Sequence, residues 1–144
     1  MKNNIISYNQ PSIDNTDISS VVKVLKSKNL TQGKVSSLFE NAIIRYTNSK
    51  HCLLFNSAST ALIAACKALN FDHKDILWTS AVSFVASSNC ALFFNSKVDF
   101  LDIDLKTFNI DLNLLKKKLK AAKIKKTLPK AIVIVHLGGN PCDL

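Results

Sequence analysis

The chain has 144 residues, of which 47% are hydrophobic and 20% are charged, a composition that argues against disorder and suits one packed domain. The formal net charge is +9, and nearly all of the positive charge comes from lysine, because Arg45 is the only arginine. Since specific recognition of phosphates and bases favours arginine, this charge alone does not indicate a nucleic-acid partner.

Two opening helices are followed by alternating strands and helices, as hydrophobic periodicity and capping residues indicate. Asp14 or Thr16 is the expected N-cap of the first helix. Strands joined through helices predict a mostly parallel sheet covered on both faces, which is a three-layer α/β/α domain without an internal boundary. The expected helices are 12–28, 35–48, 60–69, 83–94 and 112–126, and the expected strands are 51–55, 75–79, 97–104 and 131–137.

The helix expected over 112–126 carries a lysine run that invites a nucleic-acid interpretation. Its apolar residues keep the helical period and no aromatic residues interleave, so a solvated lysine face is the favoured reading. The aspartates within 102–111 lack the spacing of a calcium loop, and no metal site is expected. The side chains expected to face inward are Leu112, Leu115, Leu119 and Ala122.

The four cysteines are Cys52, Cys66, Cys90 and Cys142, and no two of them form a CxxC pair. The first three lie in apolar surroundings, where reduced buried thiols are common. The first residues contain no apolar core of a signal peptide, and no apolar run approaches the ~20 residues that span a bilayer. We therefore expect a reducing, cytoplasmic setting and no membrane partner.

Small polar side chains gather in "FNSASTALIAAC", residues 55–66, at the expected junction of a strand and a helix. The N-terminus of a helix offers unpaired N–H groups and the positive end of its dipole, so the hydroxyls of Ser57, Ser59 and Thr60 could help to hold a phosphate. Serine and threonine are also common helix caps. On the residues alone, capping is the commoner explanation.

Three further features lie at expected strand ends or loops. Phe84, in "SFVASSN", could lie flat against a planar ring, although core packing is commoner for phenylalanine. The segments around Tyr8 and 28–31 read as polar turns. His136 precedes Gly138 and Gly139, and a lone histidine there is more often structural than catalytic.

Six segments occur together in one order that resembles the DegT/DnrJ/EryC1/StrS aminotransferases, and the resemblance runs from Tyr8 to Leu144. Members of this family are pyridoxal-phosphate enzymes of the aspartate aminotransferase fold, and they aminate keto groups on nucleotide-linked sugars. The sequences "SKNLTQGK" and "FNSAST" are most similar to those of the UDP-4-amino-4,6-dideoxy-N-acetyl-beta-L-altrosamine transaminase branch. The six segments are "YNQP", "SKNLTQGKVSSLFENAI", "FNSASTALIAA", "SFVASSN", "FLDIDLKTFNID" and "VHLGGNPCD".

The resemblance implies roles for individual residues. The segment matching the family's phosphate-binding motif would bind the phosphate of pyridoxal 5'-phosphate, with Ser59 and Thr60 the strongest candidates, and Phe84 would stack on the pyridine ring. A second group of residues would contact the sugar nucleotide. The implied cofactor residues are Ser57, Ala58, Ser59, Thr60 and Phe84, and the implied substrate residues are Tyr8, Lys28, Asn29, Leu30 and Thr31.

The resemblance also implies what the complete enzyme does. Residues 1–144 would form the N-terminal part of its large domain, and the enzyme, a homodimer, would move an amino group from glutamate to a UDP-linked 4-keto sugar for polysaccharide biosynthesis. The family's cofactor-binding lysine lies in an S-x-H-x-x-K context that no lysine here has, and the aspartate that pairs with the cofactor nitrogen is also missing. We therefore expect no catalytic residue and no activity in this chain alone; the alternative is a non-catalytic partner of a full-length paralogue.

The sequence departs from the family at a few positions. The family usually has a proline near Ser80, a tyrosine or similar residue where Gly138 stands, and a glycine near Asn95 and Ser96. These changes are expected to leave the fold intact.

Overall fold

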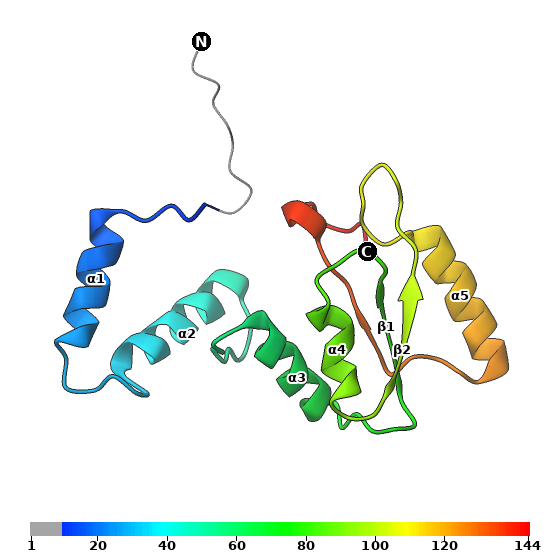
Figure 1. Ribbon diagram of the computed structural model, residues 1–144, viewed down its shortest axis with the longest axis horizontal. Helices are drawn as coiled ribbons and strands as arrows, with labels where there is room; N and C mark the ends of the chain where they lie inside the picture. The colour runs from blue at the N-terminus through cyan, green and yellow to red at the C-terminus, as the bar shows by residue number, and fades with distance from the viewer. Residues whose placement is uncertain (1–9) are drawn as a thin grey trace, which may run out of the picture. The chain divides into compact units, whose positions relative to one another are not determined.

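The structure of the protein, a computed structural model, describes residues 10–144, so Tyr8 lies outside the described residues. The chain divides into two compact units, Met1–Leu54 and Phe55–Leu144, which are described separately below (Figure 1). Sequence patterning showed no such boundary. No helix in the described part of the chain is long and apolar enough to cross a membrane.

The first unit contains two helices, α1 (Asn15–Leu25) and α2 (Lys34–Thr47). Asp14 caps α1, as one of the two expected candidates, and it shares a reciprocal capping box with Asp17. Asn48 ends α2 in the left-handed conformation, at φ 54°. Neither helix contains a buried residue, so their apolar side chains are at least partly exposed.

The second unit holds a sheet of three parallel strands in the order β2-β1-β3 (Figure 1). Leu77 of β1 pairs in register with Val98 of β2 and with Ala131 of β3. The described elements are α3 (Ala58–Ala68), β1 (Ile76–Ser80), α4 (Ala86–Leu92), β2 (Lys97–Leu101), α5 (Leu112–Lys125), β3 (Ala131–Val133) and a short 3-10 helix, η1 (Leu137–Gly139).

The sheet separates two apolar clusters, which confirms the expected three layers. Leu77 packs with Cys66 of α3 and Cys90 of α4 on one face. The next residue of β1, Trp78, packs on the other face with Leu115 and other residues of α5. This alternation follows from the pleat of a strand, whose successive side chains point to opposite faces. The central strand β1 is accordingly the most buried element.

The inward residues of α5 are confirmed, because Leu115 and Ala122 are buried and Leu112 and Leu119 pack against them. The expectation that all lysines of this helix face solvent is wrong at Lys118. Its Nζ lies 2.7 Å from Asp99 Oδ2, donates to the backbone oxygen of Phe100 and stands 4.7 Å from the ring centre of Trp78. The long lysine stem therefore lies across the sheet.

The strand expected over 51–55 is wrong: these residues form no strand. A strand needs neighbouring backbone groups for its hydrogen bonds, and among the described residues the sheet contains β1, β2 and β3 only. The Leu54 N–H instead donates to Glu40 Oε1 at 3.1 Å, and Leu53 is 75% exposed. The strand expected over 131–137 shortens to Ala131–Val133 and is half-buried, because β3 lies at an edge of the described sheet.

The burial expected for the cysteines is confirmed at Cys66 and Cys90, while Cys52 is half-buried and all four are unpaired. Burial among apolar side chains raises the pKa of the Cys66 thiol to about 12, with a smaller contribution from the neighbouring Cys90. Both thiols therefore act as small apolar groups between α3 and α4.

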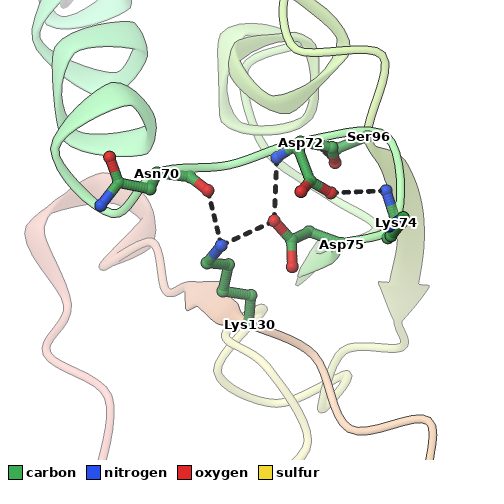
Figure 2. Close-up of polar contacts among 6 residues, drawn as sticks. All are labelled: Asn70, Asp72, Lys74, Asp75, Ser96 and Lys130. Atoms are coloured by element: carbon green, nitrogen blue, oxygen red, sulfur yellow. Dashed lines mark hydrogen bonds and ion pairs between the residues drawn. The ribbon is translucent and has the colours of Figure 1, made fainter.

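A polar network joins the amino ends of the three strands (Figure 2). Lys130 Nζ, just before β3, donates to the Asn70 backbone oxygen at 2.6 Å and to Asp75 Oδ2 at 2.7 Å. The same Asp75 oxygen accepts from the Asp72 N–H at 2.8 Å. Ser96, just before β2, donates its hydroxyl hydrogen to the Asp72 carbonyl. These bonds stabilise the sheet at the end opposite the candidate site.

Candidate cofactor and substrate site

The chain returns from each strand of unit 2 through a loop at the carboxyl ends of the strands. Residues 81–85 follow β1, residues 102–111 follow β2, and η1 follows β3 at the same edge. Figure 1 shows α3 and α4 both beginning toward this edge, and the two helices are in contact. Open parallel sheets bind ligands at this edge, and the residues predicted to bind the cofactor lie at the helix starts on this side.

The first turn of α3 is organised by side-chain hydrogen bonds. Ser57 is the N-cap, and its Oγ accepts from the Thr60 N–H at 3.2 Å. The Thr60 hydroxyl lies 2.7 Å from Asn56 Oδ1 and 2.9 Å from the Ser57 carbonyl, both of which can accept its hydrogen. The capping that the sequence pattern favoured is therefore present, and it engages Ser57 and Thr60.

Three donors at the start of α3 have no partner among the described residues: the N–H groups of Ala58 and Ser59 and the hydroxyl of Ser59. A helix leaves its first N–H groups unsatisfied, and they sit at the positive end of its dipole. This donor set suits a phosphate group. Of the two residues predicted as the strongest phosphate ligands, Ser59 has a free hydroxyl among the described residues, whereas the Thr60 hydroxyl is already hydrogen-bonded.

Phe84 lies in the loop between β1 and α4 and is 74% exposed. Core packing, which was the commoner expectation for this residue, is therefore wrong for Phe84. A large exposed aromatic ring beside the carboxyl end of a strand is available for stacking on a planar ligand.

The predicted substrate segment lines a hollow of about 530 Å³ in unit 1, between the end of α1 and the start of α2. Lys28, Asn29 and Leu30 contribute to its wall, and Thr31 does not. Gly33 is the N-cap of α2 and lines this hollow, and an added Cβ there would lie 2.8 Å from the Asn29 backbone oxygen. The loop therefore requires glycine at this position.

A residue that sequence reasoning missed is Asn109, which is buried at the carboxyl end of the sheet. Its Nδ2 donates to the Asn140 carbonyl at 2.9 Å, and its Oδ1 accepts from the Leu137 N–H at 3.1 Å. Asn109 thus holds the loop around η1 against the loop that follows β2. An amide inside the quoted segment "FLDIDLKTFNID" was the available signal, because a buried amide needs partners on both of its polar atoms.

Three further polar side chains of these loops have structural partners. His136 Nδ1 accepts from the Cys142 N–H at 3.0 Å, in line with the structural reading of this histidine. Asp111 caps α5 through the N–H groups of Asn113 and Leu114. Hydrogen bonds from the Lys106 and Thr107 N–H groups hold the pKa of Asp104 below its usual value.

The fold and the donor set together define a class of protein. It is an α/β unit with a parallel sheet and, at the carboxyl edge of that sheet, a helix start whose free donors can hold an anion. The profile of the DegT/DnrJ/EryC1/StrS aminotransferase family matches residues 11–144, and the chain belongs to this family.

Individual relatives agree with this assignment. The chain is 38% identical over 141 residues to a UDP-4-amino-4,6-dideoxy-N-acetyl-beta-L-altrosamine transaminase of Campylobacter jejuni, covering 97% of the chain and 36% of that protein. It is 34% identical to the spore coat polysaccharide biosynthesis protein SpsC of Bacillus subtilis, covering 99% of the chain and 35% of that protein. The chain therefore spans about a third of the length of these relatives.

A solved structure matches as well. Helicobacter pylori PseC, an aminotransferase of pseudoaminic acid biosynthesis, superposes with a TM-score of 0.83 at 35% identity, over 95% of this chain and 36% of PseC. The sugar aminotransferase Spr1654 of Streptococcus pneumoniae gives a TM-score of 0.81 at 26% identity, over 96% and 33% of the two chains. The expected fold, that of the sugar aminotransferases, is thereby confirmed.

Proposed function

We propose that this chain supplies the N-terminal part of the large domain of a nucleotide-sugar aminotransferase that uses pyridoxal 5'-phosphate. The enzyme would transfer an amino group from glutamate to a UDP-linked 4-keto sugar, as a dimer in a reducing, cytoplasmic compartment. Family membership and the similarity to UDP-sugar transaminases support the reaction class. The observation that carries the cofactor assignment is the unpartnered donor set at the start of α3.

The residues of α3 bind the phosphate in this proposal. The N–H groups of Ala58 and Ser59 and the Ser59 hydroxyl donate to phosphate oxygens, while Ser57 and Thr60 keep the turn in the shape that presents these donors. Phe84 orients the flat face of the ring. When bound, the cofactor supplies an electron sink for amino transfer.

Substrate recognition is proposed for the hollow in unit 1. Lys23, Lys28 and Lys34 line it together with the apolar residues Val24 and Leu30. Ammonium groups around a partly apolar surface suit a ligand that combines a diphosphate with less polar sugar and base parts.

The cofactor assignment is tested by calorimetric titration of the chain with pyridoxal 5'-phosphate and with pyridoxal, which lacks the phosphate. We expect the phosphate form to bind more tightly. Ser59→Ala should weaken its binding at least about tenfold, because a hydrogen bond to a charged group contributes roughly 1.5–3 kcal/mol. Thr16→Ala removes a hydroxyl at the same position of α1 and serves as the matched control. Equal affinities for the two ligands, or an unchanged Ser59→Ala variant, would contradict the assignment.

We also propose that the chain has no transaminase activity alone, because none of its lysines has the family's S-x-H-x-x-K context. The chain is incubated with the cofactor, glutamate and a UDP-linked 4-keto sugar, and the amino sugar is measured by mass spectrometry. No product is expected. Turnover together with borohydride trapping of the cofactor at one specific lysine would contradict this part of the proposal.

A further inference from the structure

A second hollow, of about 610 Å³, lies in unit 2 where the carboxyl ends of β1 and β2 meet α5. Helix α5 packs on the face of the sheet opposite to α3 and α4 (Figure 1). None of the described residues assigned above to the cofactor or to the sugar nucleotide lines this second hollow. Its lining therefore serves no role that the proposed function assigns.

The strand side of the second hollow has a fixed backbone and an apolar surface. The Ala81 N–H donates to the Leu101 carbonyl at 2.8 Å, and the Asp111 N–H donates to the Asp102 carbonyl at 2.9 Å. Leu101 is buried in this wall, and Leu114 of α5, which is 39% exposed, faces the same hollow. A site whose walls are held in place before binding loses less conformational entropy when a ligand binds.

Three charged side chains line the second hollow, and one of them already has an ionic partner. Lys118 Nζ lies 2.7 Å from Asp99 Oδ2. Lys117 and Asp102 form no ion pair among the described residues, and the Asp102 carboxylate accepts only from the next N–H, that of Ile103, at 3.3 Å. The second hollow thus offers one ammonium and one carboxylate that remain available to a ligand.

These two opposite charges limit the kind of ligand that fits. A purely anionic ligand is attracted by Lys117 and repelled by Asp102, and a purely cationic ligand meets the reverse. A neutral apolar ligand removes water from both charges and gives neither a partner, which costs free energy. A ligand with one carboxylate, one ammonium and an apolar part complements the two charges and the leucine surface together.

We propose that the second hollow binds a free α-amino acid with an apolar side chain, for example leucine. The carboxylate of the ligand pairs with Lys117, its ammonium pairs with Asp102, and its side chain lies against Leu101 and Leu114. Lys117 and Asp102 are exposed, and exposed ion pairs contribute little, so we expect a dissociation constant in the millimolar range. The inference does not depend on cofactor binding, because the two sites share no residue.

The test is a nuclear magnetic resonance titration of the isotope-labelled 144-residue chain with L-leucine, without pyridoxal 5'-phosphate. Two analogues are the comparison ligands: isoamylamine, which is leucine without its carboxylate, and isocaproate, which is leucine without its ammonium. We expect L-leucine to shift the amide signals of Asp102, Leu114 and Lys117 and to leave that of Ser59 in place. Each analogue should bind about fivefold more weakly than L-leucine, because each loses one exposed ion pair.

Two variants test the two charges separately. Lys117→Gln should weaken L-leucine binding about fivefold and should not weaken isoamylamine, which has no carboxylate. Asp102→Asn should weaken L-leucine to a similar extent and should strengthen isocaproate, because a repulsion is removed. Lys116→Gln is the matched control, since Lys116 is the neighbouring lysine of α5 and does not line the hollow. All three residues are exposed, so the substitutions should leave the fold intact, which the amide spectrum itself reports.

Three results would overturn the proposal. The first is the absence of amide shifts around the second hollow at high millimolar L-leucine. The second is an analogue that binds as tightly as L-leucine. The third is a loss of affinity in Lys116→Gln as large as that in Lys117→Gln, which would show general attraction to the lysines of α5.

Discussion

At the scale of single residues, the structure explains a departure from the family that the sequence only flagged. Asn95 lies near the position where the resemblance implies a glycine, and it follows α4 in the left-handed conformation, at φ 56°. The Ser96 N–H donates back to the Ala91 carbonyl at 3.3 Å, which is the pattern of a helix C-terminal turn. Asparagine tolerates this conformation better than other non-glycine residues, so the turn is retained.

Asn95 therefore provides a matched pair of variants. Asn95→Ala should lower the free energy of unfolding by about 1 kcal/mol, because alanine adopts a positive φ at a cost of roughly 1–2 kcal/mol. Asn95→Gly should match or exceed the original stability, since glycine has no Cβ to clash. Urea unfolding followed by far-ultraviolet circular dichroism measures both. Equal losses in the two variants would show that the Asn95 side chain, and not its backbone conformation, stabilises the turn.

At the scale of elements, the pairing of Lys130 with Asp75 links the segment before β3 to the segment before β1 (Figure 2). The hydrogen bond from Lys130 is the main cause that holds the pKa of Asp75 below the usual 3.8. A carboxyl with a lowered pKa stabilises the fold above its unfolded pKa and loses that contribution as the pH falls through its folded pKa. The contribution is therefore present at pH 7 and decreases below about pH 4.

Asp75→Asn tests this link. The variant should unfold at a lower urea concentration than the original chain at pH 7, and the difference should shrink as the pH is lowered below 4. Asp72→Asn is the control, because among the described residues the Asp72 carboxylate accepts only from the nearby Lys74 N–H, whereas Asp75 pairs with Lys130 just before β3. A difference between Asp75→Asn and the original chain that does not change with pH would refute the electrostatic origin.

Local sequence patterns correctly predicted the elements whose structure depends mainly on their own residues. Asp14 caps α1, as predicted, and the leucine spacing of α5 identified its buried face. The errors occurred where the structure of a segment depends on the residues that it contacts. Residues 51–55 have the composition of a strand but no neighbour to pair with in the described residues, and Lys118 turns inward because Asp99 lies on the adjacent strand.

The candidate site was predictable to a similar extent. Ser59 could be singled out because hydroxyls at a helix start have a known chemistry, and the family resemblance supplied the ligand. The exposure of Phe84 and the tie between Asn109 and the η1 loop could not be predicted, because both depend on how distant segments pack. The hollow beside Lys28 likewise arises from the packing of two helices.

At the scale of the whole molecule, the two units differ in the kind of packing that each has. Helices α1 and α2 contain no buried residue, whereas both apolar clusters lie among residues of the second unit. Helices of 11 and 14 residues without a buried face are marginal in water, because most helical stability comes from tertiary packing. The first unit should therefore open locally far more often than the second.

Hydrogen exchange with proteolytic mass spectrometry measures this difference directly. Amides of α1 and α2 should exchange at least a hundredfold faster than those of β1, whose residues Leu77 and Trp78 are fully enclosed by the two clusters. Brief treatment with trypsin should accordingly cleave at lysines within residues 10–54 before it cleaves in α5, although α5 carries more lysines. Equal protection of α1 and β1 would mean that the apolar side chains of α1 are covered in solution, by self-association of the chain or by another protein.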